Sequence, residues 1–294
     1  MGDLFLPYNW HARDYQMPLW NYLRNGGKHA VVIAHRRYGN DEIGLHHAAC
    51  AAYERVGGYC HMLPFYAQAR KALWDAVNPH SGKRRIDEAF PHELRTHTRE
   101  QEMSIGFTNG STWQLAGSDN YDALMGTSYA GIVESEYALG NPSAHSYFSP
   151  ILRENDGWSL IITTPRGHNH AEAMLKTAKA GQREGKDYYW EVSPADKTSV
   201  FTAEELQEEL VEMQNMHGEQ FGKSLWLQEY FASFDAAIPG SVWGDCMDKL
   251  QQRGQISHVP HDATRGVFTA WDLGRTDATA IWWFQMFAGE VRVL

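Results

Sequence analysis

The segment HAVVIAHRRYGND, residues 29–41, gives the clearest local signal of fold class. Residues 29–34 are a largely apolar run that predicts a buried strand, Gly39 marks a turn, and helical character runs from Asp41 to Arg55. A strand, turn and helix N-terminus in this order can bind phosphate, because backbone N–H groups and the helix dipole face the anion. Of the usual GxxxxGK[ST] pattern only Gly39 matches outright, with Ala34 at the first glycine, Asn40 at the lysine and Asp41 at the hydroxyl position. An ordinary strand-to-helix turn capped by Asp41 therefore remains an alternative.

Short apolar runs and helical stretches alternate along the rest of the first 200 residues. We expect strands at residues 58–63, 129–133, 159–163 and 188–192, a helix at 67–77, and a hairpin that joins 105–107 to 112–116. This alternation predicts an α/β fold with a mostly parallel central sheet. At Thr202 a capping box with Glu205 opens an acidic helix, a second helix is expected at 219–230, and residues 236–265 are rich in turns. We interpret 201–265 as a helical lid and linker.

Composition limits the classes of function. The 294 residues carry a formal net charge of -10, whereas a static DNA clamp usually has a basic excess, so any DNA contact should be local or transient. The basic run Lys83-Arg84-Arg85 is predicted to be a solvated loop. The three cysteines form no CxxC pair, which argues against a zinc site or a disulfide framework and favours a reducing cytoplasm. No apolar run is long enough for a membrane span and the N-terminus is no signal peptide. The pairs His46-His47 and His168/His170 lack metal-ligand spacing and are expected to be exposed or capping.

A second chemical motif lies in GIVESEYALGNP, residues 131–142. An apolar strand that ends in Asp-Glu holds Mg²⁺ and polarises water in many nucleotide hydrolases; here Ser135 stands for the aspartate and Glu136 for the glutamate. A surface carboxylate at a strand end is the alternative for Glu136. The segment LIITTPRG, residues 160–167, follows as a strand that ends in two threonines, and WHARDYQ, residues 10–16, lies near the start.

Taken together and in this order, from Trp10 to Ile281, these segments resemble the large terminase subunits of tailed bacteriophages, in their podovirus-like branch. The resemblance implies a RecA-like (ASCE) P-loop NTPase. Glu136 would activate water, and Arg36 would stabilise the transferred phosphoryl group as a cis arginine finger. Thr163 and Thr164 would couple hydrolysis to motion of the lid. The implied ATP-binding residues are Gln16, Arg36, Arg37, Tyr38, Gly39, Asn40 and Asp41, with Mg²⁺ held by Asp41 and Ser135. An exposed Gln16 on an amphipathic helix is the alternative to an adenine contact.

Three positions depart from the family pattern. Asn40 lacks the lysine charge that stabilises the transition state of phosphoryl transfer, so hydrolysis is expected to be impaired more than ATP binding. Ser135 lacks the carboxylate of the general motif, although serine before glutamate is common in the podovirus-like branch, and Asp41 would supply the anionic charge from the side of the glycine turn. Met125 stands where the family usually has an arginine before Gly126.

The C-terminal segment AWDLGRTDATAI, residues 270–281, resembles the first strand of the terminase nuclease, an RNase H-like fold. Asp272 and Asp277 would be remnants of a metal site; turn-capping carboxylates are the alternative. Further metal ligands come from later strands in the family, so we expect an incomplete nuclease in a chain that stops at Leu294. The predicted division is an ATPase core at 1–200, the lid and linker at 201–265, and a truncated nuclease start at 266–294.

The function implied is ATP-driven translocation of viral double-stranded DNA into the procapsid. Expected partners are DNA, the portal protein and the small terminase subunit, with a homo-oligomeric ring during packaging and a monomer in isolation. The expected location is the host cytoplasm, transiently at the portal vertex, and not the virion. Two alternatives remain: a packaging protein or prophage fragment that binds nucleotide but hydrolyses it poorly, and a RecA-like helicase, for which the helical stretch 202–234 is short for a second motor lobe.

Overall fold

The computed structural model describes residues 4–124, 126–235, 250–251, 253–273 and 279–294. The chain divides into two compact units, Met1–Ile238 and Pro239–Leu294. The predicted lid and linker at 201–265 is thus shared between the units, and the proposed three-part division stays a prediction. Among the described residues, no helix has both the length and the apolar character needed to cross a membrane.

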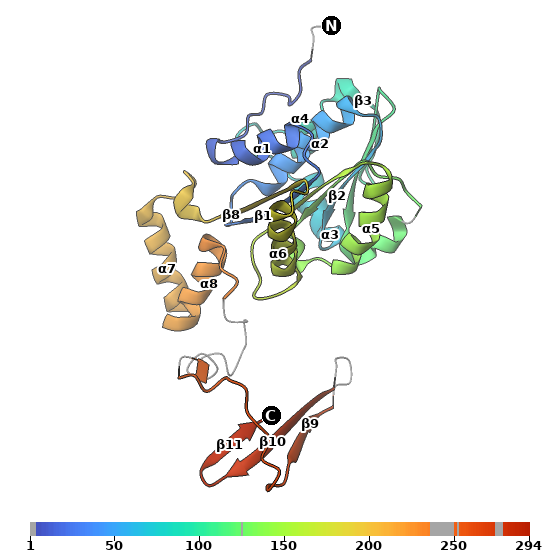
Figure 1. The fold of residues 1–294 in the computed structure, drawn as a ribbon. Coiled ribbons are helices and arrows are strands. Elements are labelled where there is room, and N and C mark those ends of the chain that lie inside the picture. The colour runs from blue at the N-terminus through green and yellow to red at the C-terminus, as the bar shows by residue number, and fades with distance from the viewer. Residues whose placement is uncertain (1–3, 125, 236–249, 252, 274–278) are drawn as a thin grey trace. The chain divides into compact units, whose positions relative to one another are not determined.

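The first unit is built on an eight-stranded sheet with the order β3-β4-β5-β2-β6-β7-β1-β8 (Figure 1). The six strands from β5 to β8 in this order are parallel, and β3 and β4 add an antiparallel edge. The predicted α/β class with a mostly parallel sheet is confirmed. The strands are β1 (His29–Ala34), β2 (Gly58–Leu63), β3 (Arg95–Arg99), β4 (Ser104–Phe107), β5 (Thr112–Gly117), β6 (Gly131–Ser135), β7 (Trp158–Thr163) and β8 (Tyr188–Ser193).

Helices cover both faces of this sheet, because side chains alternate between the faces along each strand. On β1, Val32 packs with α1 and α2, whereas Val31 and Ile33 pack with α6. The helix α5 covers the same face as α6, over β2 and β6. The helices of the core are α1 (Met17–Arg24), α2 (Asn40–Glu54), α3 (Tyr66–Ala69), α4 (Arg85–Ala89), α5 (Pro142–Glu154) and α6 (His170–Arg183). Short 3-10 segments are η1 (Asp14–Gln16), η3 (His92–Leu94), η4 (Ser118–Leu124), η5 (Tyr137–Leu139) and η6 (Ala195–Lys197), and η2 (Arg70–Trp74) is a short π-helix.

Helix α2 is buried almost from end to end, because α1 and α4 cover the side that the sheet leaves free. The prediction for His46 and His47 is therefore wrong: both side chains are buried. His46 stacks on Trp10 and His47 lies edge-on to Trp158. Aromatic packing, rather than exposure, accounts for these two histidines.

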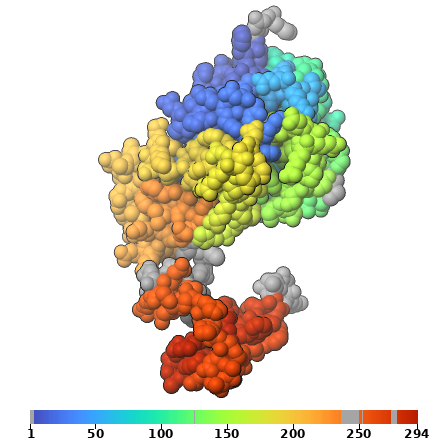
Figure 2. All heavy atoms as spheres, viewed as in Figure 1, coloured from blue at the N-terminus to red at the C-terminus, as the bar shows by residue number. Residues whose placement is uncertain are grey.

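Two further helices, α7 (Ala203–His217) and α8 (Glu219–Phe231), complete the first unit (Figure 1), and their atoms form its yellow to orange part (Figure 2). The predicted capping box is present: Thr202 Oγ1 accepts from the Glu205 N–H at 3.1 Å, and the Glu205 carboxylate accepts from the Thr202 N–H at 2.8 Å. The helices pack through Leu206, Trp226 and Tyr230, and the Trp226 indole donates to the Leu206 carbonyl. This pair corresponds to the helical stretch expected after the sheet.

The second unit contains a three-stranded antiparallel sheet with the order β11-β10-β9. Its strands are β9 (Phe268–Asp272), β10 (Ala280–Phe287) and β11 (Glu290–Val293). Gln285 is buried and its side chain donates to the backbone carbonyls of Asp262 and Arg265, which ties the segment before β9 to the sheet. Asp272 lies exposed at the end of β9, and Asp277 falls outside the described residues.

Candidate active site

The turn after β1 is shaped by a glycine and held by a glutamine. Gly39 has a left-handed backbone with φ of 93°, and a Cβ built on it would lie 2.9 Å from the Gln16 amide nitrogen. That amide donates to the Tyr38 carbonyl at 2.8 Å, and its oxygen accepts from the Arg13 N–H. Gln16 is therefore buried beneath the loop, with both ends of its amide bonded to backbone, and it fixes the loop at the N-terminus of α2.

Of the other residues of the turn, Tyr38 anchors it in the core, whereas Arg36 and Arg37 are exposed. Tyr38 is fully buried and its hydroxyl donates to Glu191 on β8 at 3.3 Å. Arg36 and Arg37 are exposed, and Arg37 adopts a left-handed φ of 68°. The Asn40 side-chain oxygen is buried without a hydrogen-bond partner among the described residues. The loop thus presents two arginines and an unpaired amide oxygen at the carboxyl end of β1.

Asp41 contacts the end of β6 directly. Its Oδ1 accepts from the Ser135 hydroxyl at 2.6 Å, and His61 Nε2 lies 3.1 Å from Ser135 Oγ and 3.5 Å from Asp41 Oδ1. Because the Ser135 hydroxyl gives its proton to Asp41, His61 Nε2 must donate to the serine. Burial alone would raise the pKa of Asp41, but His61, Arg85 and the Ser135 hydroxyl outweigh it and hold the pKa below its ordinary value. An ionised carboxylate therefore sits where helix and strand meet.

Glu136 follows β6 in a left-handed backbone conformation, with φ of 53° and ψ of 37°. This conformation costs a non-glycine residue roughly 1–2 kcal/mol, and such strain is concentrated at functional sites. Burial raises the pKa of the Glu136 carboxyl and the Asp41 carboxylate raises it further, against opposing effects of Arg166 and Arg36. A carboxyl whose pKa is shifted toward neutrality suits a group that accepts a proton during the reaction.

The strand between β1 and β6 ends in the two threonines of the predicted coupling segment. The Thr163 side chain is buried at the end of β7, where its Oγ1 accepts from the Ala138 N–H at 3.0 Å, two residues after Glu136. Thr164 faces the same cavity as Glu136. The end of β7 is thus hydrogen-bonded to the turn that positions Glu136.

Sequence reasoning assigned no role to two residues that join the loop to α8. Glu229 on α8 is buried, and its carboxylate forms ion pairs with both Arg36 and Arg166. The Glu229 carbonyl also accepts from the Arg36 N–H at 2.9 Å. Arg166 follows the two threonines in sequence, so that position alone could have suggested it, whereas nothing local to the helical sequence singles out Glu229.

One cavity of about 1540 Å³ brings these groups together. Its lining includes Gly39, Asn40 and Asp41 from the turn, Glu136 and Thr164 from the neighbouring strand ends, and Phe201 and Tyr230 from the helical side. The cavity lies at the carboxyl edge of the parallel strands, where ligands bind in open α/β sheets. The two motifs that the sequence placed in one site, the glycine turn and the acidic strand end, do share it.

This arrangement is a RecA-like α/β fold with a glycine turn between β1 and α2, and comparison with solved structures gives the more particular match. The ATPase domain of the Thermus phage P74-26 large terminase matches with a TM-score of 0.54 at 21% identity, over 77% of this chain and 100% of that one. The large terminase of a thermophilic bacteriophage matches with a TM-score of 0.57 at 12% identity, over 96% of this chain and 67% of that one.

The bacteriophage HK97 large terminase matches with a TM-score of 0.56 at 13% identity, over 97% of this chain and 63% of that one. At these identities the comparisons establish the fold, which is that of a large terminase ATPase domain. The second of these three proteins, the large terminase of the thermophilic bacteriophage, has also been solved with ADP and with ATP-gamma-S. Neither a protein-family model nor a curated protein matches the chain.

Proposed function

We propose that this chain is the ATPase part of a large terminase subunit, which uses ATP to drive viral double-stranded DNA into a procapsid. The observation that carries the proposal is the shared cavity: the Gly39 turn at the N-terminus of α2 and the Glu136 carboxyl face one space at the carboxyl edge of the sheet. The large terminase of the thermophilic bacteriophage, which has this fold, binds ADP and ATP-gamma-S.

The residues divide the chemistry among themselves. The α2 N-terminus and the 35–39 loop receive the phosphates, Glu136 orients and deprotonates the attacking water, and Arg36 neutralises charge on the transferred group. Thr163 and Thr164 lie beside the terminal phosphate, and the hydrogen bond from the Ala138 N–H to Thr163 couples its release to the turn after Glu136. Gln16 acts through the loop that it braces, and its amide would reach adenine only by exchanging its bonds to Tyr38 and Arg13.

A magnesium ion fits the pair Asp41 and Ser135. The described residues contain no group of three or more His, Cys, Asp or Glu side chains that could hold a metal alone. Mg²⁺ on a nucleotide usually takes one or two protein ligands beside phosphate oxygens and water. The ionised Asp41 carboxylate, with the Ser135 hydroxyl 2.6 Å away, offers such a pair. When bound, the ion would neutralise phosphate charge.

The remaining assignments follow from the same proposal. A net charge of -10 agrees with transient rather than static contact with DNA, helped by the portal protein, the small terminase subunit and a ring of copies in the host cytoplasm. Asp272 and Asp277 belong to a nuclease metal site in this proposal.

A second candidate, a packaging protein that binds nucleotide but turns it over poorly, is favoured by Asn40. Its side chain brings no charge to the phosphates, and its buried oxygen is unpaired in the part of the chain that the structure describes. An acceptor oxygen facing phosphate oxygens is unfavourable, so the amide must present its NH₂ group to the nucleotide. Binding should survive this substitution better than turnover.

The test is Mg²⁺-dependent phosphate release from ATP by the unmodified chain, Asn40→Lys and Glu136→Gln, with Asp156→Asn as control. Asp156 pairs with Lys28 at the opposite edge of the sheet. We expect slow release by the unmodified chain, faster release by Asn40→Lys, and a loss of about 10²-fold or more in Glu136→Gln. If the unmodified chain and Asn40→Lys both bind Mg·ATPγS but release no phosphate, the ATPase proposal fails and the binding-only alternative stands.

A further inference from the structure

The positive charge that is absent at position 40 has a candidate replacement on the wall of the cavity. In the part of the chain that the structure describes, six arginine and lysine residues line this cavity: Arg13, Arg36, Arg37, Lys83, Arg85 and Arg166. Arg36 and Arg166 are held by Glu229 on the helical side, and Arg13 donates to the Tyr15 hydroxyl. Arg85 differs from these because it lies against the residues that follow position 40 on α2.

Arg85 contacts both acidic neighbours of Asn40. Its Nε donates to Glu42 at 2.5 Å, and its Nη1 lies 3.9 Å from Asp41 Oδ2. Nη1 also donates to the Ala72 carbonyl at 2.9 Å. The guanidinium is half-buried, so the charge is fixed beside the proposed magnesium ligand and less screened than a surface charge.

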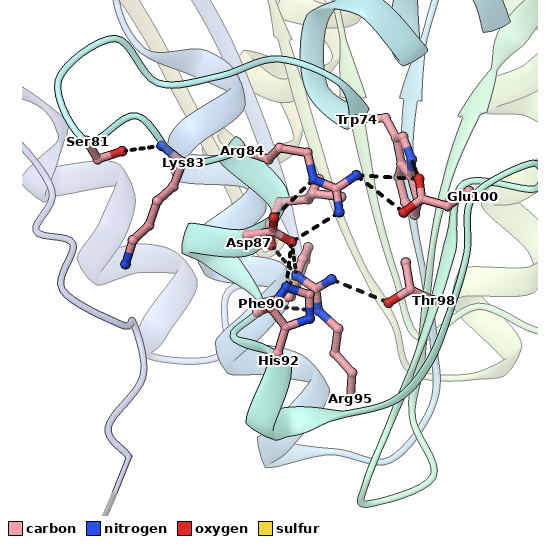
Figure 3. A network of polar contacts seen from close by, with 11 residues as sticks. Trp74, Ser81, Lys83, Arg84, Asp87, Phe90, His92, Arg95, Thr98 and Glu100 are labelled. Atoms are coloured by element: carbon pink, nitrogen blue, oxygen red, sulfur yellow. Dashed lines mark hydrogen bonds and ion pairs between the residues drawn. The ribbon is translucent and has the colours of Figure 1, made fainter.

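Residues next to Arg85 in the sequence belong to a network of ion pairs and hydrogen bonds (Figure 3). The adjacent Arg84 points away from Lys83, toward Asp87 and Glu100, with contacts of 3.0 and 3.3 Å. Asp87 also pairs with Arg95 at 2.7 Å, and the Trp74 indole donates to Glu100. Backbone bonds from Asn78 to Lys83 and from Arg85 to Ala76 close the loop. The predicted solvated loop therefore describes Lys83 but is wrong for Arg84 and Arg85.

We propose that Arg85 supplies, from the start of α4, the positive charge that Asn40 does not bring to the nucleotide phosphates. The proposal rests on the proposed function, since it needs a nucleotide in this cavity. Glu42 keeps the guanidinium in place, and arrival of the triphosphate shares that charge between Glu42 and phosphate oxygens. Arginine suits this role because its planar fork can bond a carboxylate and a phosphate together.

The experiment measures the Kd of Mg·ATPγS by calorimetry for the unmodified chain, Arg85→Met and the matched control Arg84→Met. Arg85→Met should weaken binding about tenfold or more, the usual effect of losing a charge-assisted contact, whereas Arg84→Met should stay within about twofold. In an Asn40→Lys background the loss caused by Arg85→Met should shrink to less than about threefold, because the lysine restores the charge. Glu42→Gln should leave binding equal or tighter, because it frees the guanidinium.

The outcomes separate this proposal from the function on which it rests. If the unmodified chain and Asn40→Lys both fail to bind Mg·ATPγS, the proposed function falls and this proposal with it. If the unmodified chain binds and Arg85→Met binds equally well, only the role of Arg85 is overturned. An equal loss in both backgrounds, with Glu42→Gln as weak as Arg85→Met, would assign Arg85 to the packing of α2 alone. Thermal unfolding of every variant checks that each one folds.

Discussion

The anionic charge of the site lies on the helix rather than on the strand. Ser135 ends β6 where a carboxylate would otherwise be expected, and Asp41 on α2 approaches to 2.6 Å, so that the two positions act as one polar unit. His61 completes the unit from β2 and lies fully buried. The neutral residue at 135 is therefore no loss of charge at the site, because the neighbouring helix provides it.

The strained and half-buried Glu136 should reduce the stability of the folded chain at neutral pH. Its pKa in the folded state is raised above the ordinary 4.5, so the folded state binds the proton more tightly than the unfolded state does. The stability that it contributes is fully present below the ordinary pKa and is lost as pH rises through the raised value. We therefore expect Glu136→Gln, which mimics the protonated form, to have a higher Tm than the unmodified chain at pH 7.

The pH dependence of this difference is the decisive measurement. Melting curves of both chains should converge as pH falls below about 4.5, within the range where the chain stays folded, because Glu136 is then protonated in both states. A Tm difference that is independent of pH would contradict a raised pKa and would point to a simple packing effect. The pKa that governs the acidic limb of the pH profile of kcat/KM should likewise lie above the ordinary pKa of glutamate, because kcat/KM reports the pKa values of the free enzyme.

Glu229 attaches helix α8 to the 35–39 loop through its carboxylate and its backbone carbonyl. Glu229 neutralises Arg36 and Arg166, which belong to two different loops of the site. Glu229→Gln should lower the Tm of the nucleotide-free chain by about 5 °C, as expected for the loss of 1–3 kcal/mol of charge-assisted bonding. It should also enlarge the Tm increase on adding Mg·ATPγS, because phosphates then neutralise the two freed arginines.

Differential scanning fluorimetry with and without Mg·ATPγS measures both effects. The exposed Glu208→Gln on α7 serves as control and should change neither. An unchanged or smaller nucleotide effect in Glu229→Gln would show that the arginines do not turn to the phosphates, and α8 would then be only a structural support.

Helix α2 lies so close to the sheet that its fifth residue, Gly44, has no room for a side chain. A Cβ on Gly44 would lie 2.9 Å from Val133 Cγ1 and 3.3 Å from His61 Cε1. Gly44→Ala should therefore reduce the free energy of unfolding by about 1–3 kcal/mol through overpacking, although alanine is the better helix former by about 1 kcal/mol. Urea denaturation gives the sign, and a stabilised variant would show that α2 can move away from β6 without cost.

The sequence predicted the order of the elements well, because the strands of the parallel sheet are mostly apolar runs and helical stretches lie between them in the sequence. The hairpin at Asn109-Gly110 was predicted as well and is present as β4 and β5. The sequence pattern did not predict the helices α5 and α6, in which apolar and polar residues are mixed. Contacts between distant segments, such as Arg85 with Glu42, or Glu229 with Arg36, leave no local pattern. The residues that complete the site from neighbouring elements therefore emerge only from the fold.

The whole first unit should fold and bind nucleotide without the second. Among the described residues, those that line the cavity lie between Tyr8 and Tyr230, and the eight strands of the sheet lie within residues 29–193. A chain that ends at residue 235 should therefore keep the main melting transition within about 3 °C, a change of roughly 1 kcal/mol in a protein of this size. It should also keep its Kd for Mg·ATPγS within about twofold. A larger fall in Tm, or lost binding, would mean that the second unit contributes to the stability of the nucleotide site, and the site would then be a property of both units.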